Sequence, residues 1–140
     1  MSGSWSKDLA TGLEVIDAQH REYFARVDKL LNACLQDTGG ATVRETFAFM
    51  QQYLIHHFAT EEGLMTEHAY PQAAMHKKQH VWFAGELDRL HLEIDGPTGG
   101  SPMPLNGLLV DWFRNHIKTM DCRLTGFIKT RIKTAQDAPR

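Results

Sequence analysis

The sequence predicts an all-α protein, an up-down-up-down bundle of four helices preceded by an N-terminal arm. Apolar residues recur at alternating spacings of four and three along four successive segments, which is the pattern of one buried helix face. Glycine- and proline-rich stretches separate these segments. Helices of about 20 residues, each about 30 Å long, pack antiparallel when the connections between them are short.

The chain has 140 residues, and its 42% hydrophobic content suits one compact domain. We expect this single domain to fill residues 1–140. The arm would cover residues 1–12 and the bundle about 13–132. The remaining residues, about 133–140, would form a disordered tail.

The arm shows no clear period, and we expect its two large apolar side chains, Trp5 and Leu9, to pack on the bundle. The stripe of the first helix is Ile16, His20, Tyr23, Val27, Leu30 and Cys34. The second helix begins after the breaker pair Gly39 and Gly40. Its stripe is Val43, Phe47, Met50, Leu54, His57, Glu61 and Leu64.

The third helix begins just after Pro71, because proline suits the start of a helix. Its stripe is Ala73, His76, His80, Phe83, Leu87 and Leu90. A loop rich in glycine and proline over 95–104 ends it. The fourth helix then begins near Leu105 and ends near Ile132. Its stripe includes Leu109, Trp112 and His116.

Composition excludes several classes of partner. With 15 Lys and Arg against 17 Asp and Glu, neither nucleic acid nor an anionic membrane surface is an expected partner. No apolar run reaches the roughly 20 residues of a membrane span, and no secretory signal is recognisable, so a cytoplasmic location is expected. Cys34 and Cys122 form no CxxC pair, which argues against a disulfide framework or a thiolate zinc site. The ordinary surface composition predicts a monomer.

Polar residues occupy stripe positions where leucine would be usual. They are His20, His57, Glu61, His76, His80 and His116, on four different helices. A bundle interior would bring them together, and buried imidazoles and carboxylates without partners oppose folding. A metal centre removes this cost. Imidazole and carboxylate without thiolate suit iron, manganese, zinc or cobalt.

The spacing of two pairs supports such a centre. Glu61 follows His57 by four residues, and His80 follows His76 by the same interval. Each pair therefore lies on one helix face, one turn apart.

The fourth helix leaves two interpretations open. Asp121 follows His116 by five residues, which places it about 140° away on a regular helix. If both residues bind metal, the helix needs a π-bulge between them. Otherwise the helix is regular and Met120 faces the core.

Three further histidines are not predicted to bind metal. His56 lies about 100° from the stripe that carries His57. His68 falls in the connection before the third helix, and His91 lies near the end of that helix, where a cationic side chain suits the helix dipole.

Together these motifs resemble the hemerythrin family and, within it, the single-domain bacteriohemerythrins. The matching stretches are DAQHRE with His20, HFATEE with His57 and Glu61, HKKQH with His76 and His80, and HIKTMD with His116 and Asp121. They appear in the family's order and span residues 17–121. All seven ligand positions carry the family's residue type, which is more specific than any single motif.

The resemblance implies two iron ions joined by an oxo or hydroxo bridge. One iron would be bound by His76, His80 and His116, the other by His20 and His57, with Glu61 and Asp121 bridging. Five imidazoles, two bidentate carboxylates and the bridge then fill all but one position of two octahedral irons. The open position belongs to the iron with two histidines. O2 would bind there reversibly as a hydroperoxide, and nitric oxide, azide or other small anions are further candidate ligands.

Residues beside the ligands are candidates for the wall of an O2 pocket: Tyr23, Phe24, Phe58, Trp112, Phe113 and Ile117. An ordinary core role is equally open for the aromatic ones. Tyr23 departs from the family, which usually has an aliphatic side chain three residues after the first ligand. If Tyr23 faces the site, its hydroxyl could bond the bound ligand or admit water, whereas little changes if Phe24 takes that place.

The leading functional hypothesis is an O2-binding protein for carriage, storage or delivery, and not an enzyme. One alternative is a sensor of O2, nitric oxide or redox state, although the chain has no second domain to receive a signal. Another is a di-iron oxidase or peroxidase. Such enzymes usually use glutamate-rich ligand sets, whereas five imidazoles stabilise high-valent iron less well. A purely structural bundle would leave the polar stripe unexplained.

Overall fold

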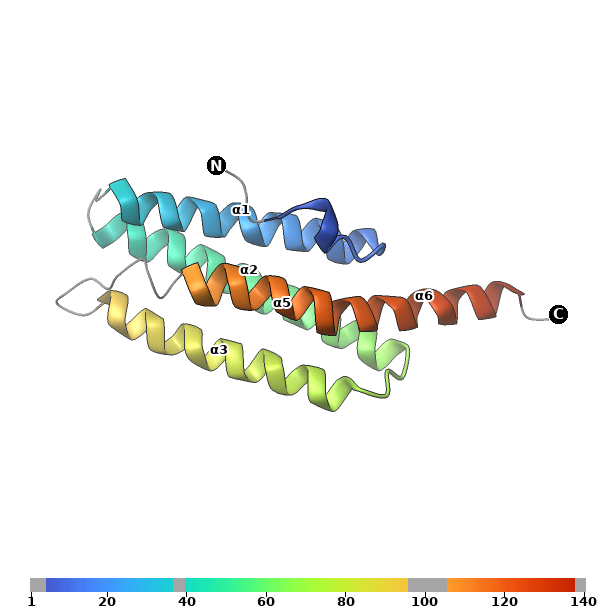
Figure 1. Cartoon of the computed structure of the whole chain (residues 1–140). Helices are drawn as coiled ribbons and strands as arrows, with labels where there is room; N and C mark the ends of the chain where they lie inside the picture. The colour runs from blue at the N-terminus through green and yellow to red at the C-terminus, as the bar shows by residue number, and fades with distance from the viewer. Residues whose placement is uncertain (1–4, 37–39, 96–105, 138–140) are drawn as a thin grey trace.

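The structure, a computed structural model, describes residues 5–36, 40–95 and 106–137 (Figure 1). Its elements are η1 (Lys7–Leu9), α1 (Glu14–Gln36), α2 (Gly40–Glu67), α3 (Ala73–Asp95), η2 (Gly107–Trp112), α5 (Phe113–His116), η3 (Ile117–Asp121) and α6 (Cys122–Asp137). The last four follow one another without a break and form a single rod, the fourth helix of the bundle. Within it, η2 and η3 are π-helical.

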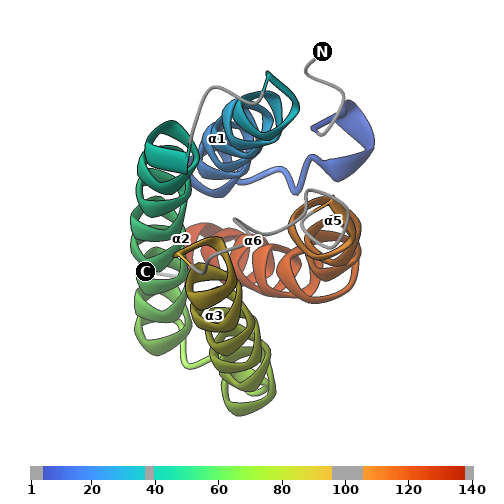
Figure 2. The same ribbon diagram turned by 90° about the vertical axis from the view of Figure 1, so that its left-hand side faces the viewer.

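The four rods alternate in direction along the chain, which confirms the up-down-up-down bundle (Figure 1). Viewed end on, they surround a common interior (Figure 2). Helix α1 packs against α2, α2 packs against α3, and η2 contacts α1. The short connection after α2 is closed by its own backbone. The Tyr70 N–H donates to the Met65 carbonyl over 2.9 Å, and Ala69 has a φ of 52°, the left-handed conformation that commonly ends a helix.

The interior contains two apolar clusters. Along each helix that contributes to both, buried polar residues, which we call the polar layer, come between the residues of one cluster and those of the other. The larger cluster includes Leu54, Phe83 and Phe113, and the smaller one includes Met65 and Leu124. Along α2 the polar layer falls between Leu54 and Met65, and along the fourth helix between Phe113 and Leu124. Burial of the apolar side chains supplies the main driving force for folding and holds the polar layer in place.

The N-terminal arm packs on the bundle, as predicted. Leu9 is completely buried in the larger cluster, and Trp5 packs against it. The buried Asp17 carboxylate anchors the segment that follows, because it accepts the backbone N–H groups of Thr11 and Gly12 over 2.8 and 3.1 Å. Gly12 has a φ of +91°, a conformation that favours glycine. The chain thereby enters α1 in a fixed direction.

The fourth helix differs from the prediction in two ways. It continues to Asp137, five residues beyond the predicted end at 132, and part of the expected tail is therefore helical (Figure 1). Nothing between 132 and Asp137 breaks a helix, since the next proline is Pro139. The π-helical η2 was not predicted. The predicted start at Leu105 lies outside the described residues.

Between residues 5 and 137, in the ranges that the structure describes, no helix is long and apolar enough to cross a membrane.

Candidate metal centre

All seven predicted ligands meet in the interior of the bundle. None has more than 2% of its surface exposed, and they come from all four rods. Their donor atoms form two groups, each with all members within 4.8 Å of one another. One group is Glu61, His76, His80, His116 and Asp121; the other is His20, His57, Glu61 and Asp121. We call these groups the three-histidine side and the two-histidine side. The two carboxylates belong to both.

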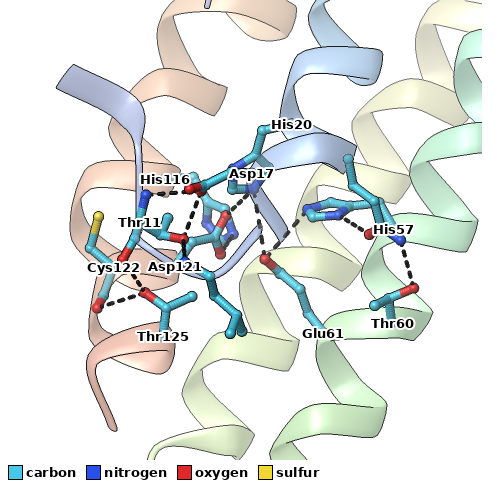
Figure 3. Close-up of polar contacts among 12 residues, drawn as sticks. Thr11, Asp17, His20, His57, Thr60, Glu61, His116, Asp121, Cys122 and Thr125 are labelled. Atoms are coloured by element: carbon cyan, nitrogen blue, oxygen red, sulfur yellow. Dashed lines mark hydrogen bonds and ion pairs between the residues drawn. The ribbon is translucent and has the colours of Figure 1, made fainter. Parts of the chain in front are cut away.

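The Asp121 carboxylate lies between the two sides. Its Oδ1 is 2.9 Å from His76 Nε2 and 3.1 Å from His116 Nε2. Its Oδ2 is 2.9 Å from His20 Nε2, on the other side (Figure 3). One oxygen thus faces each group of imidazoles, which is the arrangement of a bridging carboxylate.

The Glu61 carboxylate divides its oxygens in the same way. Its Oε1 lies 3.1 Å from His80 Nε2 and 3.4 Å from His76 Nε2. Its Oε2 lies 3.4 Å from His57 Nε2 and 3.8 Å from His20 Nε2 (Figure 3). Two carboxylates on different helices therefore link the same pair of imidazole groups.

The donor atoms lack well-formed hydrogen bonds. The Nε2 atoms of all five imidazoles and all four carboxylate oxygens are buried without a hydrogen-bond partner. Buried polar atoms are almost always satisfied in folded proteins, and each exception needs a cause. One metal ion within each group would give all nine atoms a partner. The residues present therefore fit a centre of two metal ions.

The charges also favour a cation. Burial lowers the pKa of His20, but the close Asp121 and Glu61 carboxylates outweigh it and raise the pKa to about 9. The same balance raises the pKa of His76 to about 9. Burial opposes ionisation of both carboxyls, yet the surrounding imidazoles hold the pKa of Glu61 and of Asp121 well below the usual range. Both carboxylates therefore stay negative, and a cation between the imidazoles would be attracted to them.

Three imidazoles are oriented by a partner on a neighbouring helix. The Nδ1 of His57 lies 2.8 Å from Gln19 Oε1, and the Nδ1 of His116 lies 2.7 Å from Gln79 Oε1. The Nδ1 of His80 lies 2.8 Å from Glu62 Oε2. An Nδ1–H that donates to such an oxygen leaves Nε2 free to bind metal.

The sequence reasoning did not find these partners. Gln19, Glu62 and Gln79 each stand next to a predicted ligand along the chain. A residue beside a ligand points to the flank of its helix, toward the next helix of the bundle. That signal was available in the motifs, but it does not say which imidazole the partner reaches.

The π-bulge interpretation of the fourth helix is confirmed. Residues Ile117–Asp121 are π-helical, and the Cys122 N–H donates to the Ile117 carbonyl five residues earlier. This wider turn brings His116 and Asp121 to the same side of the rod, with 3.1 Å between their donor atoms. Met120 is nonetheless buried, as the regular-helix alternative required.

Three of the candidate wall residues contact the ligand imidazoles. The Phe113 ring lies between the two sides, with its centroid 5.9 Å from that of His20, 6.2 Å from that of His57 and 6.0 Å from that of His116. Phe58 stacks on His80 at 3.8 Å, and Trp112 stacks on His116 at 4.9 Å, both on the three-histidine side.

The other three wall candidates pack in the apolar core. Tyr23 stacks on Phe113 at 4.1 Å, and its hydroxyl donates to the Leu109 carbonyl over 2.9 Å. Phe24 packs edge-on against Phe113 at 5.8 Å. Ile117 is buried in the larger apolar cluster. The Tyr23 hydroxyl is thus bound to the backbone of another helix.

The histidines that were not predicted to bind metal lie outside both groups. His56 is exposed beside α1, where its Nε2 is 3.5 Å from Gln19 Nε2. His68 follows the end of α2, and His91 packs against Phe47 near the far end of α3.

A buried cluster of imidazoles and shared carboxylates, carried on four antiparallel helices, defines a metal-binding helical bundle. Comparison with known families agrees with this class. Residues 11–127 match the model of the hemerythrin HHE cation-binding domain. The chain belongs to the hemerythrin family.

Named relatives support the same assignment. The chain is 34% identical over 118 residues to a bacteriohemerythrin of Pseudomonas paraeruginosa, covering 84% of this chain and 75% of that protein. It is 31% identical over 128 residues to the bacteriohemerythrin of Stenotrophomonas maltophilia, covering 91% and 82%. A myohemerythrin of Sipunculus nudus is 27% identical over 122 residues, covering 87% and 90%. The crystal structure of a hemerythrin variant has the same fold, with a TM-score of 0.82 at 23% identity over 90% of this chain and 97% of that chain.

Proposed function

We propose that this protein binds O2 reversibly at a non-haem di-iron centre. In this proposal His76, His80 and His116 bind one iron, and His20 and His57 bind the other. Glu61, Asp121 and an oxo or hydroxo group bridge the two ions. When bound, the two ions would supply the redox chemistry that reversible O2 binding requires, and these seven side chains would hold them in place.

The observation that carries the proposal is the unequal number of imidazoles on two otherwise matched sides. Each side has one oxygen of Glu61 and one of Asp121, but one side has three Nε2 atoms and the other has two. With one further bridging atom, the three-histidine side reaches six ligands and the two-histidine side reaches five. A small ligand then has one place to bind, beside His20 and His57.

The aromatic rings beside His20 and His57 support binding of a small neutral ligand there rather than entry of water. Phe113 covers the rings of His20 and His57, and Tyr23 covers Phe113 from behind. An apolar wall excludes water and anions, which would otherwise promote irreversible oxidation of the metal. The Tyr23 hydroxyl is committed to the Leu109 carbonyl, so it does not supply a polar group to the site.

The ligand set favours O2 carriage, storage or delivery over oxidation of a substrate. Five neutral imidazoles and only two carboxylates donate less negative charge than the glutamate-rich sets of oxygen-activating di-iron proteins. Such a centre stabilises high-valent iron poorly. Nitric oxide and azide have the size and chemistry to bind at the same position.

The decisive experiment is a visible absorption spectrum of the purified protein with its iron content measured. The protein is reduced under argon, exposed to O2 and swept with argon again. We expect two irons per chain and a charge-transfer band that appears with O2 and disappears when O2 is removed. A band that persists as a diferric product, or a protein that holds zinc alone, would contradict reversible O2 binding.

A further inference from the structure

The Tyr23 hydroxyl makes a hydrogen bond that links α1 to the start of the fourth helix. Its acceptor, the Leu109 carbonyl, lies 2.9 Å away inside η2, and both residues are completely buried. Burial raises the pKa of Tyr23 well above its ordinary value. The hydroxyl therefore remains protonated and always acts as a donor.

A π-helical segment needs such a donor. In a π-helix each N–H bonds to the carbonyl five residues earlier, whereas in an α-helix it bonds to the carbonyl four residues earlier. Where a π-helical segment passes into an α-helix, this change of spacing passes over one backbone carbonyl, and at the end of η2 the Phe113 N–H donates to the Val110 carbonyl, one residue beyond Leu109. A buried carbonyl without a hydrogen bond destabilises the conformation that exposes it, and Tyr23 supplies the bond from another helix.

Phe113, the first residue of α5, directly follows η2, so the conformation of η2 sets its position. Its ring is stacked on Tyr23, with 4.1 Å between centroids and 23° between planes. Its other contacts include His20 and His57, the imidazoles of the two-histidine side. The order across the interior is therefore Tyr23, Phe113, and then the imidazoles beside the place proposed for the small ligand.

We propose that Tyr23 is a positioning residue that sets the rate at which small ligands reach the two-histidine side. Its hydroxyl fixes η2, and its ring holds Phe113 against His20 and His57. Ligands enter when this contact opens. This inference rests on the proposed function for the identity of the site, but the hydrogen bond that it invokes does not depend on iron.

The test uses Tyr23→Phe, which keeps the ring and removes the hydroxyl. Tyr70→Phe is the matched control, because Tyr70 is also buried but lies in the smaller apolar cluster beside Phe127. Two quantities are measured on the protein as purified: hydrogen exchange of the backbone amides over 107–117, and the rate at which azide binds to the diferric form. A variant without the stacked ring, Tyr23→Leu, extends the series.

We expect Tyr23→Phe to increase amide exchange over 107–117 about fivefold, the effect of one net hydrogen bond on an opening equilibrium, and to increase the azide rate by a similar factor. Exchange in α2 should not change, and Tyr70→Phe should match the parent. Tyr23→Leu should bind azide faster still.

Unchanged exchange in Tyr23→Phe would overturn the role of the hydroxyl. Faster exchange with an unchanged azide rate would overturn its role in ligand entry. A merely structural effect would lower thermal stability in Tyr23→Phe and Tyr70→Phe alike without changing the azide rate. Because exchange requires no iron, failure of the di-iron proposal and failure of the Tyr23 proposal give different results.

Discussion

The two sides of the metal centre share the same carboxylates but differ in how they are supported. On the three-histidine side, Phe58 lies flat on His80 and Trp112 lies flat on His116. Their Nδ1 atoms are held by Glu62 and Gln79, respectively. On the two-histidine side, His57 alone has an Nδ1 partner of this kind, Gln19, and the neighbouring ring of Phe113 is tilted or edge-on to the imidazoles.

Under the proposed function, the three-histidine side would hold metal more rigidly, and the two-histidine side would admit the ligand. Stacked rings and Nδ1 partners orient two imidazoles of the three-histidine side, His80 and His116, whereas the Nδ1 atoms of His76 and of His20 have no hydrogen-bond partner. The two-histidine side has fewer donors and an aromatic wall that belongs to a π-interrupted helix. Four predictions test this contrast.

The largest effect should follow from removal of a shared carboxylate, because it damages both sides. We expect Asp121→Ala and Glu61→Ala to lose most of their iron. The free energy of unfolding should fall by at least about 4 kcal/mol, the contribution of a ligand at about a thousand times its Kd. Iron analysis and thermal unfolding check this. Glu93→Ala, which removes an exposed carboxylate on α3, should leave both quantities unchanged. Full iron content in Asp121→Ala would refute its bridging role.

The next prediction changes, one side at a time, the residues that orient the imidazoles through Nδ1. We expect Glu62→Leu to weaken iron binding about 10- to 100-fold at the three-histidine side, the usual effect of losing such a partner. Gln19→Leu should act on the two-histidine side by a similar factor. Iron retained against a graded chelator, with Mössbauer spectra to distinguish the two irons, provides the measurement. Identical spectra from the two variants would mean that the sides are not independent.

A smaller effect should follow from changes in the aromatic rings on each side. Phe113→Leu keeps an apolar wall but loosens it beside His20 and His57, so azide should bind several-fold faster at a cost of about 1 kcal/mol in stability. Trp112→Phe changes the ring on His116, and its azide rate should remain that of the parent. Stopped-flow mixing with the diferric protein measures both rates. Equal acceleration by the two variants would remove the contrast between the sides.

The last prediction concerns pH in the metal-free protein, where one imidazole on each side has a raised pKa. The pKa of His20 and of His76 is about 9 in the folded state, against 6.5 ordinarily. Their contribution to stability is therefore complete below pH 6.5 and is lost as the pH rises through about 9. Thermal midpoints of the metal-free protein should fall over this range. The iron-loaded protein should not show this fall, because iron requires neutral imidazoles. A rise in the metal-free midpoint would contradict this assignment.

Much of the architecture was predictable because helix periodicity and helix burial have the same cause. The alternation of three and four that includes His57 and Glu61 predicted both the buried face of α2 and the meeting of these residues with histidines from other helices. The five-residue interval between His116 and Asp121 was also informative. It required a choice between a π-bulge and a regular helix, and only the structure made that choice.

The features that were missed depend on contacts between helices. The π-helical η2 has no signature in its own residues, and its bond from Tyr23 comes from a position 86 residues away. The same holds for Gln19, which orients an imidazole 38 positions further along the chain. The sequence also left open whether Tyr23 or Phe24 would face the site. The Leu109 carbonyl gives the Tyr23 hydroxyl a hydrogen-bond partner, and the rings of both Tyr23 and Phe24 pack against Phe113.

The origin of the ligands on four separate helices has a consequence for kinetics. Each helix supplies at least one donor atom, and no donor residue has more than 2% of its surface exposed. Water or a chelator therefore cannot replace the donors one by one while the bundle is closed. Metal leaves only when at least one helix moves away, so the residence time of the metal is set by the rate of bundle opening rather than by affinity. Chelation should accelerate when the bundle is loosened at either apolar cluster, even where no ligand has been changed.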